Sequence, residues 1–148
     1  MKNFIIVLLT CSALYAQTSA VALYEESQKA LSVGNIELAG EKMRSAIEAD
    51  KSNEKFRAEF DKLNNLRNKR NNANRAVQDG RFDDAIQGFG DVLQSVPNSA
   101  ESLYGTGKAY EGKKEFMTAV DFYKKSLQVD SGYDKSKKSI SNVAKKLY

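Results

Sequence analysis

The sequence predicts an all-α protein in which pairs of helices recur along the chain. Residues 100–133 carry small and aromatic residues at helical spacing, and much of the same pattern returns 34 residues earlier, at 66–99. Strand and turn signals are nearly absent, since there is one proline, Pro97, and no Pro-Gly-Asn cluster of the kind that separates β-strands. With 148 residues, 41% of them hydrophobic and 28% charged, the chain is expected to form one domain after its leader.

The first sixteen residues predict a signal peptide. Lys2 supplies a positive charge, and the stretch from Phe4 to Leu9 supplies a short apolar core that is followed by small residues. Cleavage after Ala16 is favoured, with Ala20 as a second candidate. The mature domain would then cover 17–148 and be exported to the periplasm or the cell envelope.

A lipoprotein is the alternative reading of the same segment. The residues "LLTC" resemble a lipobox, in which Cys11 becomes the lipidated first residue. Thr10 stands where a smaller residue is usual, so cleavage after Ala16 is preferred. No apolar run in the mature chain is long enough for a transmembrane helix.

Three repeats of the pattern follow, over about 20–53, 66–99 and 100–133. In the third repeat, positions 8, 11, 20 and 24 are Gly107, Tyr110, Ala119 and Tyr123. Small residues occupy positions 8 and 20 of the other two as well, namely Ser27, Ala39, Ala73 and Ala85. Lys69 and Asn72 depart from the pattern, because they stand at positions 4 and 7, where bulky apolar residues are expected.

Two stretches lie outside these repeats. Phe56, Phe60 and Leu63 keep helical spacing through 54–65 and lead directly into the second repeat, which predicts one extended helix over about 54–78. The tail, 134–148, has Ile140 and Val143 on one face and lysines on the other. It is expected to be a capping helix.

This pattern resembles the tetratricopeptide repeat (TPR). The resemblance implies a right-handed TPR solenoid of about three helix-turn-helix repeats plus a C-terminal capping helix, with the small residues allowing close helix packing. It also implies a non-enzymatic protein–protein interaction module, an adaptor or scaffold, whose first helices line a concave groove.

Residue types exclude much of catalysis. The chain has no histidine and a single cysteine, Cys11, which the predicted cleavage removes. Cysteine and histidine nucleophiles, imidazole bases, disulfides and ordinary zinc sites are therefore not expected. Asp83 and Asp84 are neighbours on a helix and point about 100° apart, so they do not converge as an acid–base pair. We expect no enzyme, no cofactor and no metal site.

The resemblance also implies a binding site. Its groove positions hold Glu101 and Glu111 together with a larger set of donors: Arg67, Arg70, Asn71, Asn74, Tyr104, Lys108, Lys135, Lys138 and Asn142. Residues 66–148 hold fifteen Lys or Arg and ten Asp or Glu, whereas 17–65 hold seven and nine. The expected partner is therefore an acidic peptide or protein segment, and Arg70 and Lys138 are the residues expected to bind a carboxylate.

Two alternatives stay open. In the first, the protein is a structural or self-associating envelope component without a groove ligand. In the second, it binds an anionic surface or nucleic acid through "RNKRNNANR", 67–75. Only four of those nine residues are positive and none is aromatic, so nucleic acid is not the expected partner.

Overall fold

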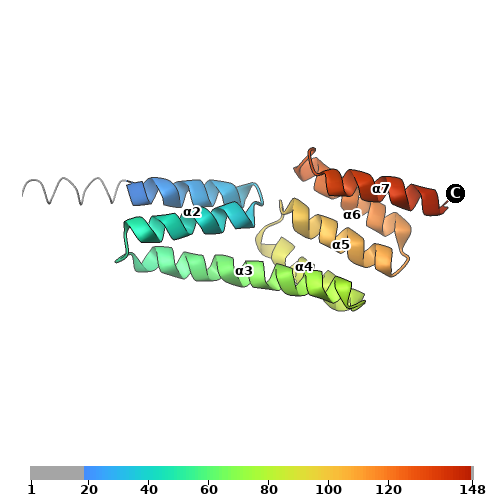
Figure 1. Cartoon of the computed structure of the whole chain (residues 1–148), viewed down its shortest axis with the longest axis horizontal. Helices are drawn as coiled ribbons and strands as arrows, with labels where there is room; N and C mark the ends of the chain where they lie inside the picture. Colours follow the sequence, from blue (N-terminus) through green and yellow to red (C-terminus); the bar gives the residue numbers. More distant parts are fainter. Residues whose placement is uncertain (1–18, 148) are drawn as a thin grey trace, which may run out of the picture. The chain divides into compact units, whose positions relative to one another are not determined.

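The computed structural model describes residues 19–147, and every regular element in that range is a helix (Figure 1). The first helix covers residues 19–32. It is followed by α2 (Ile36–Ala49), α3 (Glu54–Gln78), α4 (Phe82–Ser95), α5 (Ala100–Gly112), α6 (Phe116–Val129) and α7 (Asp134–Leu147). The predicted all-α class is confirmed for this part of the chain. The predicted signal peptide and Cys11 lie outside the described residues.

Short polar turns separate the helices, and the residues at these turns explain where helices begin and end. The Asn35 side chain accepts a hydrogen bond from the Leu38 amide at 3.0 Å and so caps the start of α2. Ser99 does the same for α5 through the Ser102 amide at 3.3 Å. Gly80 lies in the turn that follows α3. Its φ of 75° is the left-handed conformation that glycine adopts most easily, and the helix ends there.

The described helices pack as two compact units. Unit 1 contains residues 19–31 and 35–64, and unit 2 contains 32–34 and 65–147. The boundary falls inside α3, whose range is the one expected for the extended helix. One half of α3 therefore belongs to each unit. With 25 residues, the helix is long enough to contribute to two cores.

The core of unit 1 is built from small and large apolar residues in alternation. The helix over 19–32 and α2 approach closely at the small residues, and Met43, Phe56 and Leu63 fill the remaining space. The buried small residues are Ala20, Ala30, Ala39 and Ala46. Ser27 is also buried, and its hydroxyl donates to the Ala39 carbonyl at 2.7 Å across the helix pair.

Unit 2 has two apolar clusters, one around Phe89 and one around Tyr123. Both rings lie directly against glycines of α5. A Cβ atom on Gly105 would come within 2.3 Å of the Phe89 ring, and one on Gly107 within 2.5 Å of the Tyr123 ring. The glycines of α5 are therefore required for close packing, as the repeat pattern implies for Gly107.

The fold also explains the two residues that depart from the repeat pattern. Lys69 and Asn72 are exposed on α3, whereas Ala73 and Ala76, which follow them on the same helix, are buried. Both residues line a cleft between α3 and α4, where Lys69 Nζ lies 3.5 Å from an Asp91 carboxylate oxygen. Polar side chains at positions 4 and 7 therefore border a solvent-accessible cleft, in which Lys69 pairs with an acid of the next helix.

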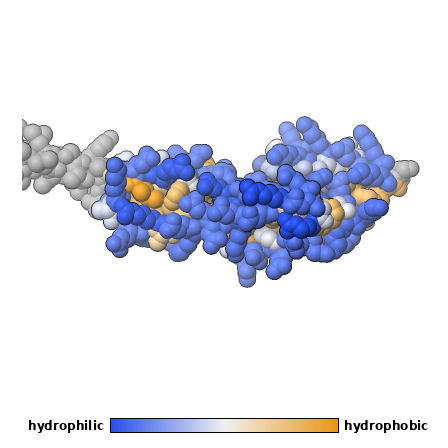
Figure 2. All heavy atoms as spheres, turned by 60° about the horizontal axis from the view of Figure 1, so that its bottom comes forward, coloured by the Kyte–Doolittle hydropathy of each residue, from blue (hydrophilic) through white to orange (hydrophobic). Residues whose placement is uncertain are grey.

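On the face drawn in Figure 2, hydrophilic residues predominate and apolar residues are confined to small areas. Among residues 19–147, no helix combines the length and the apolar character that a membrane crossing requires.

Candidate binding face

One side of α5 carries four of the residues expected at the groove. Glu101, Tyr104, Lys108 and Glu111 are spaced three or four residues apart, so they form a stripe along one side of the helix. Each of them contacts a residue of a neighbouring element in unit 2 or a member of the same stripe. These contacts bring α3, α5 and α7 together on one side of unit 2. We call this side the polar face; it comprises the α5 stripe, Arg70 of α3, and Lys135, Lys138, Asn142 and Lys146 of α7.

The first contact joins α3 to α5. Arg70 is only 4% exposed, and its Nη1 atom lies 2.9 Å from the Oε2 atom of Glu101. The sequence assigned Arg70 to a ligand carboxylate, but the structure places a carboxylate of the chain itself against this guanidinium. The pair is charge-assisted and largely withdrawn from water on the arginine side.

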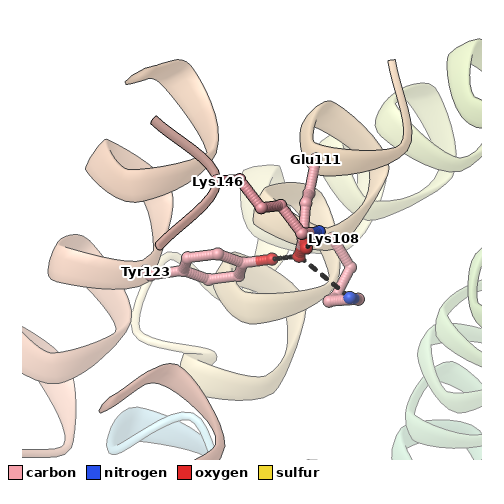
Figure 3. A network of polar contacts seen from close by, with 4 residues as sticks. All are labelled: Lys108, Glu111, Tyr123 and Lys146. Atoms are coloured by element: carbon pink, nitrogen blue, oxygen red, sulfur yellow. Dashed lines mark hydrogen bonds and ion pairs between the residues drawn. The ribbon is translucent and has the colours of Figure 1, made fainter. Parts of the chain in front are cut away.

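The second contact is a network around Glu111 at the other end of the stripe (Figure 3). Its Oε2 atom accepts hydrogen bonds from the Tyr123 hydroxyl at 2.7 Å and from Lys108 Nζ at 2.9 Å. Its Oε1 atom accepts one from Lys146 Nζ of α7 at 2.8 Å. The side of α7 that carries Lys146 therefore faces the side of α5 that carries Glu111.

This network changes the acid–base behaviour of its members. Burial by itself would raise the pKa of the Glu111 carboxyl, but the donors Lys146, Tyr123 and Lys108 outweigh it and lower the pKa to about 2. Burial, reinforced by the Glu111 carboxylate, raises the pKa of the Tyr123 phenol far above its usual value. Glu111 is thus an anion at every physiological pH, and Tyr123 remains a hydroxyl donor.

Aromatic rings lie between the two ion-paired ends. The ring of Tyr104 is 5.5 Å from that of Tyr123 and 5.6 Å from that of Tyr133, in tilted arrangements. Burial raises the pKa of the Tyr133 phenol to about 12, and the nearby Glu101 carboxylate adds to the shift. Tyr104 is half-buried, so it presents part of an apolar ring beside charged groups.

The residues predicted on α7 have a different environment. Lys135, Lys138 and Asn142 are exposed, and within residues 19–147 their side chains form no hydrogen bond or ion pair. Together with Lys146 they follow one side of the helix at spacings of three and four residues. These three side chains are available to a ligand without breaking an internal contact.

The remaining predicted residues belong to α3. Asn71 is exposed, whereas Arg67 and Asn74 are half-buried. Residues 67–75 also contain the basic segment considered for nucleic acid, and there Lys69 lies 3.5 Å from Asp91 of α4. Because Arg70 is paired as well, this segment does not present an uninterrupted row of free cations.

Sequence reasoning missed three residues that contact the stripe. Lys146 stands at repeat position 13 when the count starts at Asp134, so the same phase that led to Lys135 and Lys138 also identifies it. Tyr123 is a pattern residue, which predicts packing alone, and Tyr133 is the last residue of the third repeat, for which the pattern predicts no role. Their hydroxyl and ring contacts to α5 have no counterpart in a sequence pattern.

The described residues offer little for metal or acid–base chemistry. Nowhere within residues 19–147 do three or more Asp, Glu, His or Cys side chains gather as metal ligands would. The largest titration shifts belong to Glu111, Tyr123 and Tyr133, and each of these groups is held by contacts within unit 2.

Two solved structures are similar to this chain. The N-terminal domain of stress-induced protein-1 (STI-1) from C. elegans is 18% identical with a TM-score of 0.46, and the similarity covers 87% of this chain and 97% of that one. The TPR domain of P58(IPK) is 16% identical with a TM-score of 0.43. There the similarity covers 87% of this chain but 46% of that one, so this chain spans less than half of that structure. No family model matches the sequence, and no curated protein matches it.

The resemblance to the TPR therefore rests on the residues of the chain itself. The small and aromatic pattern residues Ser27, Ala39, Ala85, Phe89 and Tyr123 are all buried, in both units. In its sequence pattern and in the burial of that pattern between paired helices, the chain is similar to tetratricopeptide-repeat proteins.

Proposed function

We propose that this chain is an exported, non-enzymatic interaction module that binds an acidic segment of a protein partner on the polar face. In this proposal the paired helices are three repeats of a right-handed TPR solenoid, with α7 as the capping helix. The binding side is the one formed by the first helix of each pair in unit 2.

One observation supports the position of this face more than any other. The pairs Arg70–Glu101 and Lys146–Glu111 connect α3 to α5 and α7 to α5, so the stripes of all three helices face a common side. A segment lying along that side would meet all three helices at once, which is how a helical repeat protein contacts an extended ligand.

The charge of this face supports an acidic ligand. It carries five cations, Arg70, Lys108, Lys135, Lys138 and Lys146, and two carboxylates, Glu101 and Glu111. The net charge is positive even after both internal carboxylates are counted. The excess positive charge lies on α7, where the exposed Lys135 and Lys138 side chains can bind a carboxylate and the Asn142 amide lies beside them.

The cellular location is part of the proposal. The Lys2 charge and the apolar stretch that follows it support export, with Gln17 as the first residue of the mature chain. The intact mass of the exported protein tests this, because a chain that begins at a diacylated Cys11 is heavier by its lipid and by residues 11–16. If the lipidated mass is found, the protein is anchored to a membrane and is not a free periplasmic protein.

The binding proposal is tested with a fluorescein-labelled oligoglutamate peptide and the full mature chain. Replacing Lys135 and Lys138 together with alanine should weaken binding by about tenfold, since each exposed charge contact is worth roughly 0.5–1 kcal/mol. The matched control is Lys51→Ala with Lys124→Ala, which removes the same charge from exposed positions outside the polar face.

Fluorescence anisotropy at increasing salt measures both variants. The proposal requires the α7 variant to lose more affinity than the control, and the wild-type affinity to fall as salt is added. Equal losses in the two double variants would mean that the peptide responds only to net charge, and the site would not be the polar face.

A further inference from the structure

The carboxylate of Glu111 is bound on both oxygens, in the way that a receptor binds a ligand carboxylate. Two donors, the Tyr123 hydroxyl and Lys108 Nζ, bond to Oε2, and Lys146 Nζ bonds to Oε1. The donors come from α6, α5 and α7 respectively (Figure 3). All three distances, from 2.7 to 2.9 Å, are typical of charge-assisted hydrogen bonds.

Exposure differs sharply between the acid and its two lysines. The Glu111 side chain is 11% exposed, whereas Lys108 is 38% and Lys146 is 51% exposed. Each ammonium group has three donor hydrogens, and one of them bonds to Glu111. The lysines therefore contact Glu111 on their inner side and solvent on the outer side, where another carboxylate can approach.

The charges of the cluster do not cancel. Two cations share one carboxylate, so the cluster keeps one net positive charge on the polar face. Glu111 supplies the first carboxylate from the chain itself. A second carboxylate would complete neutrality, but it would compete with Glu111 for the charge of the same two ammonium groups.

We propose that Lys108, Tyr123 and Lys146 form a carboxylate-binding site that Glu111 of the same chain occupies, and that a carboxylate of the acidic partner segment binds these lysines in competition with Glu111. The first part stands on the geometry of unit 2 alone. The second part rests on the proposed function.

At the opposite end of the α5 stripe another carboxylate of α5 meets a cation, although there the cation is buried and the acid is exposed. There Glu101 of α5 lies against Arg70, a cation presented by α3. At both ends α5 thus supplies an internal carboxylate for a cation of a neighbouring helix. Internal acids at these two positions lower the affinity of the face for weakly acidic segments, and so select for partners with several carboxylates.

Chemical rescue tests the internal site without any partner. Glu111→Ala removes the carboxylate and leaves its three donors, so sodium acetate should fill the vacated position and raise the thermal midpoint of this variant by a few degrees. Sodium chloride at equal ionic strength controls for salt. Asp83→Ala is the matched variant, since within residues 19–147 the exposed Asp83 carboxylate pairs with Lys113 alone, at 2.7 Å.

Acetate should stabilise Glu111→Ala more than chloride does, and should not distinguish Asp83→Ala from the wild-type chain. Equal effects of acetate and chloride on Glu111→Ala would overturn the internal site. If Glu111→Ala loses its helical circular-dichroism signal, Glu111→Gln serves instead. Acetate should then shift the Lys108 and Lys146 side-chain NMR resonances in that variant more than in the wild type, and equal shifts would overturn the site.

Competition is tested with Glu111→Gln and the labelled oligoglutamate peptide. Removing the internal charge while keeping the side-chain shape should tighten binding by about fivefold, with a steeper dependence on salt. Equal or weaker binding by Glu111→Gln would overturn the competition. If neither protein binds the peptide, the proposed function fails for this ligand class and the competition fails with it, while the acetate experiment still decides the internal site.

Discussion

Unit 1 and unit 2 use the same helical pattern but bury different chemistry. Among the described residues, unit 1 buries a single polar side chain, Ser27, inside an otherwise apolar core. Unit 2 buries Arg70 and six hydroxyl residues, and it holds the Glu111 network as well. Apolar packing is enough to build a helix pair. The additional polar contacts of unit 2 fix charged side chains at defined positions, as a binding face requires.

The largest expected effect comes from the aromatic residue at the centre of each core. Phe89→Ala in unit 2 should reduce the free energy of unfolding by about 3–5 kcal/mol, because it removes a fully buried ring that packs on Gly105. Phe56→Ala is the matched change in unit 1, where the ring stacks on Tyr24 at 5.1 Å.

Amide hydrogen exchange shows whether the two units are separate in solution. Phe89→Ala should reduce protection in α4 and α5 and leave α2 protected, and Phe56→Ala should do the reverse. If either variant reduces protection equally in α2 and α5, the helices unfold as one cooperative body. The division into two units would then not describe the energetics.

A smaller effect, specific to unit 2, is expected from the Glu111 carboxylate. Glu111→Gln should cost about 2 kcal/mol at neutral pH, because it replaces charge-assisted bonds with neutral ones in a largely buried position. The pKa of Glu111 is lowered from its ordinary 4.5 to about 2, so its stabilising effect is complete above pH 4.5 and is lost as the pH falls towards 2.

Thermal melts of the wild type and Glu111→Gln at a series of pH values measure this directly. The difference between the two midpoints should be constant from pH 7 to about 5 and should shrink steadily below 4.5. A difference that does not change with pH would show that the amide disturbs packing and that the carboxylate charge contributes nothing.

The sequence predicts the packing residues of this fold better than its polar contacts. Small residues at fixed repeat positions, such as Ala39 and Gly107, must face a neighbouring helix, so their spacing predicts burial. The range of α3 follows from its apolar spacing too. That its halves contribute to two cores does not, because the division depends on how the long helix packs against other elements.

Ion pairs between helices are harder to predict for a physical reason. The repeat phase places Arg70, Lys108, Glu101 and Glu111 on one side of the molecule, but it does not say which cation meets which acid. That choice depends on side-chain conformations and on the distance between helices, as in the Lys146–Glu111 contact, where the partners are 35 residues apart. The basic face predicted from sequence therefore includes two internal carboxylates that lower its charge.

The smallest expected effect compares one half-exposed ion pair in each unit. Lys42 and Glu26 are both substantially exposed in unit 1, so Lys42→Gln should change the free energy of unfolding by less than about 0.5 kcal/mol. Lys146→Gln in unit 2 should cost about 0.5–1 kcal/mol, because its partner Glu111 is largely buried and loses one of its three donors. Urea unfolding at low and high salt separates the two, since screening should abolish the Lys42 effect and leave part of the Lys146 effect. Equal losses that both disappear in salt would mean that the Lys146 contact behaves as an ordinary surface pair, and that α7 is held to α5 by packing alone.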